Sequence, residues 1–575
     1  MSKDILDAVR PTEKTLFGHP MGLYVLFFTE MWERFSYYGM RAILVLYIAS
    51  SMDDGGLGWT KIDALALYGW YTMLVYVMAI PGGIIADKFI GQRKSVMIGG
   101  MILIAGHGIL AVEQPWAFYT GLGLIILGVG MLKPNISTMV GGLYSKGDIR
   151  RDKGFTIFYI GINIGAFFAS LIVGYVGEKI GWHYGFGLAG IGMALGMVIY
   201  YFGQKYLSHV GNFSGVSEDP EEKAAMSRPL TPIEKDRVKV LLLSFVIIIV
   251  FWGAFEQAGG LLNIYADEKI NRHVMDWLMP ASWFQSFNAL FIIIFGTTVA
   301  GFWATRKLKG KETSTLLKMG IGTIIMGLGF LLMVFASRDA SSIAYGTASF
   351  WWLVGAYLLH TIGELCVSPT ALSFITKLAP LKYGSIMMGV YFAATGFGNK
   401  LAGSIGEASQ EEPIKIELAS AKEQTMAFLG ANDTLLLQDK DIVIRTNAFP
   451  SENGFDLLDV NTGKSALSLI SISEEGKAKV IQTMKENSVT KENPYHITLR
   501  YSKEFEAKKI KENLGDGQHY EGKLIIEEIQ SKREYRTFLG IFILTLVFGL
   551  LVLALLKPLK RLTHGAEDDE HEVAS

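Results

Sequence analysis

The chain has 575 residues, of which 50% are hydrophobic, 12% aromatic and 19% charged, and its mean hydropathy is +0.32. The charged share lies below the roughly 25% typical of soluble domains, and the apolar residues occur in long runs, which excludes a disordered chain and an ordinary cytosolic enzyme. With 53 basic and 54 acidic residues, no net positive charge favours binding to nucleic acid. These features indicate a membrane protein.

Twelve stretches are apolar enough to cross a bilayer as helices, which takes about 20 residues each. They are residues 21–48, 62–86, 95–112, 115–140, 155–177, 183–203, 238–265, 281–305, 314–336, 346–372, 384–406 and 536–556. The loops after the second, fourth, eighth and tenth stretches contain these basic residues: Lys88, Arg93, Lys94, Lys146, Arg150, Arg151, Lys153, Arg306, Lys307, Lys309, Lys311, Lys377 and Lys382. Because basic loops stay in the cytoplasm, both termini are expected there. The first twenty residues are polar, so we expect no cleavable signal peptide.

These stretches predict an all-α membrane protein with twelve transmembrane helices in two six-helix bundles. A polar segment, residues 204–236, follows the sixth stretch and is expected to be a cytoplasmic linker. The predicted units are the N-terminal bundle 1–203, the linker, the C-terminal bundle 237–406 with 535–558, and a cytoplasmic tail 559–575.

A second polar segment, residues 407–534, lies between stretches 11 and 12. Counting the spans places it outside the cytoplasm, because a long loop crosses the membrane largely regardless of its charge. Residues 441–445 and 496–500 alternate as strands do, and residues 474–486 are typical of a helix. We expect a small α+β extracytoplasmic domain with an unidentified partner.

The first stretch contains an unusual set of polar groups. They are Glu30, Glu33, Arg34, Tyr37, Tyr38 and Arg41. On a helix they form a stripe about 140° wide, which cannot face lipid. Glu30 can pair with Arg34 one turn away, and Tyr37 with Arg41. The stripe indicates a functional site, and a structural salt bridge between helices is the alternative.

Three more ionisable residues lie within predicted spans, namely Lys133, Glu256 and Glu364. Such groups are costly in a bilayer unless paired or hydrated, so each is a functional candidate. A carboxylate that is neutral when unpaired and ionised beside Arg or Lys can carry a proton, which makes Glu33, Glu256 and Glu364 candidate proton carriers. The alternative is that they form static pairs. His360 lies one turn before Glu364 and either modulates it or is an ordinary core histidine.

Other motifs have simpler explanations. Gly128-x-Gly130-x-x-Lys133-Pro134 lacks the spacing of a phosphate-binding loop, and we expect its glycines to permit close helix contact. No nucleophile–base set or HExxH pair can be placed together, so no enzyme activity is expected. Cys366 is the only cysteine, which excludes an intrachain disulfide and a cysteine metal site. No cofactor is expected.

The segment Glu30-x-x-Glu33-Arg34-Phe35-x-Tyr37-Tyr38-Gly39 resembles the ExxERFxYYG signature of the proton-dependent oligopeptide transporters, a branch of the major facilitator superfamily. Further segments are similar to that family's patterns, namely Phe158-Tyr159-x-x-Ile162-Asn163-x-Gly165, Phe255-Glu256-Gln257, Gln285-Ser286-Phe287-Asn288 and Glu364-Leu365-x-x-Ser368-Pro369. The resemblance covers all twelve stretches but not residues 407–534.

The resemblance implies a role for each matching residue. Glu30, Glu33 and Arg34, with Lys133 and Glu256, would couple transport to protons. Arg41 and Lys133 would hold a peptide's carboxylate, and Glu364 its ammonium group. The remaining substrate-binding residues would be Tyr37, Tyr38, Tyr76, Asn163, Asn288 and Tyr391. Glu256 would pair with Arg41 in one state of the gate.

The chain also departs from relatives of that family. Tyr391 stands where many members have Trp, and Gly69 where animal members have His, so coupling would depend on carboxylates. The linker is too short and polar to hold the two extra helices of many bacterial members, and the insertion follows span 11 rather than span 9.

These observations predict a proton-coupled symporter in the plasma (inner) membrane that imports di- and tripeptides by alternating access. One alternative is a carrier of the same fold for another small anion or zwitterion. Another is a sensor or partner-docking protein that works through residues 407–534.

Overall fold

The computed structural model describes residues 14–566, apart from short gaps and three longer ones. The gaps are residues 53, 146–147, 149, 213–228, 276, 343–347, 381–382, 411–413, 419–441, 453, 460–462, 468–469, 472–473, 487–488, 492–493, 502–522 and 530–532. Part of the predicted linker therefore lies outside the described residues, as do Lys146 and Lys382 of the basic loops.

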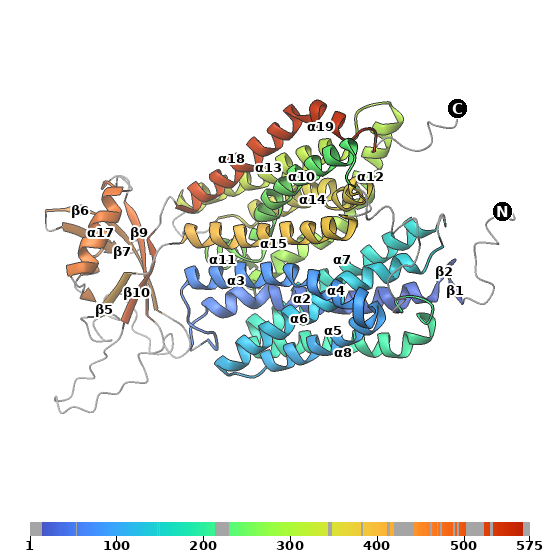
Figure 1. Ribbon diagram of the computed structural model, residues 1–575. Helices are drawn as coiled ribbons and strands as arrows, with labels where there is room; N and C mark the ends of the chain where they lie inside the picture. Colours follow the sequence, from blue (N-terminus) through green and yellow to red (C-terminus); the bar gives the residue numbers. More distant parts are fainter. Residues whose placement is uncertain are drawn as a thin grey trace.

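The first half of the chain forms one bundle of long helices (Figure 1). A hairpin of β1 (Thr15–Leu16) and β2 (His19–Pro20) precedes α2. The helices are α2 (Met21–Ala49), α3 (Lys61–Val77), α4 (Ala79–Ile85), α5 (Gln92–Leu110), α6 (Pro115–Gly142), α7 (Arg151–Lys179) and α8 (Trp182–Gly203), with short turns η1 (Ala86–Ile90) and η2 (Gln204–Tyr206). Thr60 caps α3 by accepting the backbone N–H of Asp63, and Pro115 begins α6, where a missing N–H costs nothing.

The second half forms a bundle beside the first (Figure 1). Its helices are α10 (Pro232–Phe255), η3 (Glu256–Ala258), α11 (Leu261–Lys269), η4 (Ala281–Gln285), α12 (Ser286–Leu308), α13 (Thr315–Ser342), α14 (Phe350–Leu378), α15 (Gly384–Ser409), α18 (Arg533–Ala554) and α19 (Leu556–Leu562). A small hairpin of β3 (His273–Val274) and β4 (Trp277–Leu278) joins α11 to η4. A capping box begins α10, because Thr231 and Glu234 each bond the other's backbone N–H.

A helix lies at each of the twelve predicted ranges. Within the described residues, nine helical segments are long and apolar enough to cross a membrane, and α2, α5 and α15 are not among them. Helix α2 is not among them because its charged stripe lowers its hydropathy. The charges of this stripe are buried in protein, since Glu30, Glu33 and Arg34 are at most 3% exposed. Crossing by all twelve helices stays a prediction.

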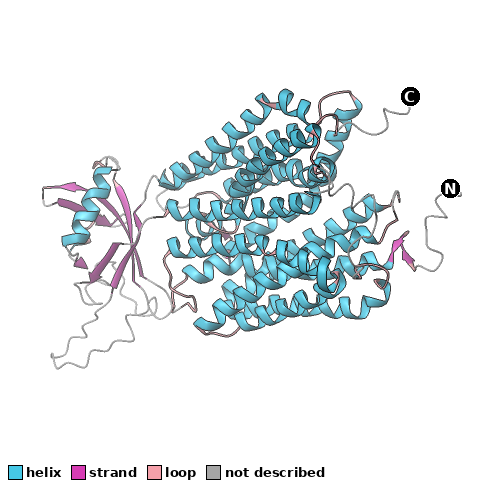
Figure 2. Ribbon diagram, viewed as in Figure 1, coloured by secondary structure: helices cyan, strands magenta, loops and turns pink. Residues whose placement is uncertain are grey.

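The segment between α15 and α18 contains an antiparallel sheet with strand order β7-β6-β9-β10-β5-β8. The strands are β5 (Ile414–Leu418), β6 (Ile442–Ser451), β7 (Gly454–Asp459), β8 (Ile470–Ser471), β9 (Tyr495–Tyr501) and β10 (Lys523–Ile529). Helix α17 (Glu474–Glu486) packs against it, and the sheet lies at the end of the bundles opposite both termini (Figures 1 and 2). Residues 442–445 of the first predicted strand lie in β6, and residue 441 lies outside the described residues. The second predicted strand lies within β9, which pairs with β6, and the predicted helix is α17.

Glycines allow several helices to touch backbone to backbone. A Cβ at Gly130 would lie 2.7 Å from the backbone oxygen of Met78, and one at Gly128 would lie 2.8 Å from that of Gly99. This confirms the interpretation of the glycine motif in α6 as a packing feature. Gly69 of α3 faces Gly403 of α15, where a Cβ would lie 2.8 Å from the Gly403 Cα. A histidine side chain therefore has no room at position 69.

Candidate functional site

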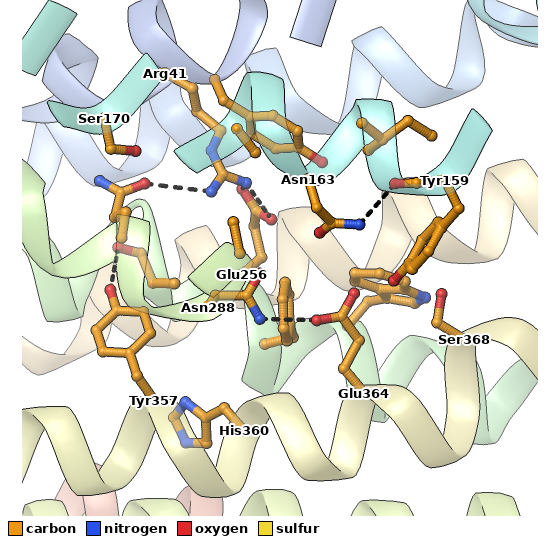
Figure 3. Close-up of a pocket in the computed structure, with 18 of the residues that line it drawn as sticks. Arg41, Tyr159, Asn163, Ser170, Glu256, Asn288, Tyr357, His360, Glu364 and Ser368 are labelled. Carbon is orange, nitrogen blue, oxygen red and sulfur yellow. Dashed lines mark hydrogen bonds and ion pairs between the residues drawn. The ribbon is translucent and has the colours of Figure 1, made fainter. Parts of the chain in front are cut away.

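A cavity of about 160 Å³ lies between the two bundles. Residues of α2, α3 and α7 from the first half line it together with residues of α10, η3, η4, α12 and α14 from the second (Figure 3). Seven of the predicted site residues are in its wall, namely Tyr38, Arg41, Tyr76, Asn163, Glu256, Asn288 and Glu364. Because both halves supply polar groups, a molecule bound here would contact both bundles at once.

Arg41 forms the main ion pair across the cavity. Its Nη1 lies 3.0 Å from both carboxylate oxygens of Glu256, which belongs to the other half. Its Nη2 donates to the side-chain oxygen of Gln285 at 3.2 Å, and the Tyr68 hydroxyl donates to Glu256. The pair is buried, with side-chain exposures of 11% and 5%. The pairing expected for one gate state is therefore present in this structure.

Glu364 occupies a different part of the same cavity (Figure 3). One of its carboxylate oxygens accepts a hydrogen bond from the Asn288 amide at 2.8 Å, and the same amide donates to the Thr361 hydroxyl at 3.1 Å. Asn163 projects from α7 and donates to the backbone oxygen of Tyr159 at 2.9 Å, which leaves its side-chain oxygen toward the cavity. A carboxylate and two amides can hold a ligand's cationic group and its amide groups.

The cluster of Glu30, Glu33 and Arg34 is buried beside the cavity rather than in its wall. Arg34 Nε lies 2.9 Å from Glu30 and also pairs with Glu33. Two carboxylates from one helix therefore share a single guanidinium in a buried place.

Lys133 lies between this cluster and the cavity. Its Nζ is 3.6 Å from the ring centroid of Tyr76, which lines the cavity, and it interacts electrostatically with Glu33 and Arg34. A cation over an aromatic face is stabilised there without a carboxylate partner. Lys133 is therefore near the cluster of Glu30, Glu33 and Arg34, and Tyr76 separates it from the cavity.

Two of the predicted tyrosines lie outside the cavity wall. The ring next to the Arg41 guanidinium is that of Tyr38, with a centroid distance of 5.0 Å, and not that of Tyr37. The adjacent position on the helix points about 100° away, so Tyr37 is buried (3% exposed) and absent from the cavity wall. Tyr391 is likewise buried in α15 without lining the cavity.

Several lining residues were not predicted. Gln285 bonds Arg41, and Tyr159, Trp252, Phe255 and Tyr357 supply aromatic walls. Gln285, Tyr159 and Phe255 stand within the family patterns given above, and this signal could have identified them. His360 lines the cavity, and the centroid of its ring lies 4.6 Å from that of the Phe330 ring. This contact holds His360 in the second half. In the described part of the chain, no group of three His, Cys, Asp or Glu residues could hold a metal ion.

Comparisons with known proteins identify the family. The sequence model of the POT family matches residues 93–220 and 223–423. The chain belongs to the POT family. It is therefore an integral membrane protein of a transporter family, and nine of its helices within the described residues can cross a membrane.

Named relatives include transporters from three bacteria. The chain is 38% identical to "Uncharacterized transporter YclF" of Bacillus subtilis, with 68% of this chain and 89% of that protein covered. It is 35% identical to "Peptide transporter YePEPT" of Yersinia enterocolitica (69% and 89% covered) and 36% identical to a "Di-/tripeptide transporter" of Lactococcus lactis (67% and 88% covered).

Solved structures share the fold. A mutant of peptide transporter POT in complex with alafosfalin superposes with a TM-score of 0.64 at 35% identity, covering 70% of this chain and 91% of that one. Peptide transporter POT in complex with sulfate gives a TM-score of 0.69 at 28% identity, covering 97% and 98%. A POT family transporter in complex with 5-aminolevulinic acid gives 0.63 at 32% identity, covering 68% and 91%.

Proposed function

We propose that this protein imports di- and tripeptides by proton-coupled symport and alternating access. The observation that carries the proposal is one cavity with Arg41 from the first half and Glu364 from the second in its wall. A short peptide is a zwitterion with a carboxylate at one end and an ammonium group at the other. Opposite charges on the two bundles would hold both ends and draw the bundles together around the peptide.

The remaining lining groups suit peptides that share a backbone but differ in their side chains. Asn163 and Asn288 would bond backbone amides, and Tyr38 and Tyr76 would form the walls of the side-chain pockets together with other aromatic residues of the cavity. Tyr391 and Tyr37 would support these walls from behind. Aromatic walls pack against many side chains without requiring one, which is consistent with relatives named as peptide and di-/tripeptide transporters.

Proton coupling would use competition for two arginines. Glu30 and Glu33 compete for Arg34, with Lys133 nearby, and Glu256 holds Arg41. When a peptide carboxylate takes Arg41, Glu256 loses its partner and binds a proton more readily. Release of the peptide would restore the pair and expel the proton, so the two cargoes would move together.

The bundles, linker and insertion would have the arrangement inferred from the charges of the loops. Both termini would be cytoplasmic in the plasma (inner) membrane, and residues 407–534 extracytoplasmic, which is consistent with a sheet at the end of the bundles opposite the termini (Figure 1). Deletion of residues 411–531 tests whether the insertion is an accessory: surviving uptake would exclude a protein that works mainly through it.

The direct test is uptake of labelled dialanine into proteoliposomes with an imposed pH gradient. Symport predicts accumulation that follows the gradient, stops when a protonophore collapses it, and is inhibited by di- and tripeptides but not by tetrapeptides. Absence of uptake by folded protein would refute the proposal.

A second candidate is import of another zwitterion, favoured by the neighbour solved with 5-aminolevulinic acid. That compound also carries an ammonium group and a carboxylate, so the same two charges would hold it. Competition separates the candidates: 5-aminolevulinic acid should inhibit dialanine uptake weakly if peptides are the substrate and strongly if small zwitterions are.

A further inference from the structure

The last turn of α7 caps the beginning of a helix in the other half of the chain. Glu178 accepts the backbone N–H of Ala281 through Oε2 and that of Ser282 through Oε1, both at 2.8 Å. The helical segment η4 follows Pro280, whose side chain makes no capping hydrogen bond. These two N–H groups at the helix start, which have no partner within the helix, are therefore satisfied by a carboxylate from the opposite bundle.

The surrounding surfaces are shaped for this contact. Positions 171, 174 and 178 lie on one face of α7, because they are three and four residues apart. The backbone oxygen of Leu171 accepts the indole N–H of Trp283 at 2.9 Å. A Cβ at Gly174 would overlap the Ser282 hydroxyl, so only glycine permits this approach. Three positions of α7 thus contact the same short segment of the other half.

Charge also concentrates at this contact. Arg272 lies 3.9 Å from Glu178, and the two side chains are only 9% and 8% exposed. The same guanidinium donates to Asp267 at 2.6 Å and to the backbone oxygen of Met279 at 2.7 Å, so it is held in place. A hydrogen bond to a buried carboxylate is stronger than a neutral one.

The contact lies at the end of the bundles that carries the inserted sheet. Helix α11, which packs against η4, lies at that end (Figure 1). A second ion pair joins the halves there, between Lys61 of α3 and Glu268 of α11 at 2.6 Å. This end is therefore held closed by contacts between the bundles.

We propose that Glu178 is a gate residue for transport. Its two hydrogen bonds stabilise the state that is closed at the insertion-bearing end, and they break when the cavity opens there. The inference rests on the proposed alternating access, since only a carrier whose halves separate at this end needs a releasable cap. Glu178 acts on the equilibrium between states and does not touch the substrate.

The test measures the separation of the halves by double electron–electron resonance. Spin labels at Met52→Cys and Met275→Cys, in a Cys366→Ala background, report on exposed positions of the first and second halves (71% and 95% exposed). We expect Glu178→Ala to increase the population with long label separation about tenfold or more, since it removes two charge-assisted bonds. Glu178→Gln, which keeps one acceptor oxygen, should give a smaller increase.

A control and a second variant make the outcome specific. Glu113→Gln makes the same charge change at an exposed site beyond the end of α5 and should leave the distances unchanged. Ala281→Pro removes one of the two donors at the first helical position, where proline is compatible with the extended backbone of Pro280. It should shift the distances in the same direction as Glu178→Gln.

If folded Glu178→Ala and Ala281→Pro proteins give the wild-type distance distributions, the proposal is overturned, and the two bundles are permanently joined at this contact. The measurement needs no substrate. If the variants shift the label distances but the wild-type protein takes up no peptide, the gate role of Glu178 stands and the proposed function is refuted.

Discussion

Replacement of Glu256 by Gln tests whether the carboxylate of the protein and that of a peptide compete for Arg41. In the structure Glu256 accepts two contacts of 3.0 Å from Arg41 and one bond from Tyr68. Loss of one partner of a buried ion pair costs about 3–5 kcal/mol, because the other charge is left uncompensated. The variant without peptide should therefore unfold at a lower temperature than the wild type.

A peptide carboxylate would supply the missing charge. If it recovers about half of that loss, dialanine should bind the Glu256→Gln protein roughly tenfold to a hundredfold more tightly than the wild type, since each 1.4 kcal/mol is a factor of about ten. Calorimetric titration of the purified full-length protein measures this, and thermal unfolding with dialanine should show the stability restored.

Two controls test whether the gain in affinity depends on the peptide carboxylate. Dialanine amide lacks that group and should gain no affinity in the variant. Glu312→Gln removes a partly exposed ion pair with Lys560 inside the second bundle, which contributes only about 0–1 kcal/mol, and should leave dialanine binding unchanged. An equal gain for dialanine and its amide, or no gain for either, would refute competition at Arg41.

Four further predictions concern other parts of the molecule. Glu33→Gln should abolish accumulation driven by a pH gradient but retain peptide counterflow; wild-type accumulation would contradict the coupling role. Glu364→Gln should weaken dialanine binding about 10- to 100-fold but leave N-acetyl-dialanine binding unchanged, and equal losses would show that it does not hold the ammonium group. Burial lowers the pKa of His19 below its ordinary value of 6.5. The docked hairpin β1–β2 should therefore be stable above pH 6.5 and loosen as the pH falls below it, which hydrogen exchange can measure. The same pH dependence in a His19→Gln protein would exclude His19 as the responsible group. Gly130→Ala should destabilise the fold by about 1–3 kcal/mol through overpacking, whereas Gly123→Ala, with open space around it, should not; comparable thermal unfolding of the two would contradict the helix contact.

Much of the fold could be predicted from hydropathy. A membrane requires long apolar helices, so the positions of α6, α7 and α13 follow from the runs of apolar residues alone. The strands β6 and β9 and the helix α17 could also be predicted from the sequence, because alternation and helical periodicity are local properties of the chain. The side of the membrane on which the insertion lies stays a prediction.

The sequence by itself also determined which residues carry buried charge. Glu30 lies one turn before Arg34, so that pairing follows from the periodicity of the helix. The contact of Glu33 with Arg34 joins adjacent positions and does not follow from that rule. The contact of Arg41 with Glu256 came from the family resemblance, since no local rule joins residues of two bundles.

Only the tertiary structure decided which side chains share the cavity and which lie behind it. Neighbouring positions on a helix differ by about 100°, so Tyr38 faces the cavity while Tyr37 is buried against other helices, and the packing of the bundles sets that rotation. Glu178 illustrates the same limit, because a carboxylate at a helix end is ordinary in sequence. Its partners are backbone N–H groups that carry no sequence signal and meet it only when the two bundles dock.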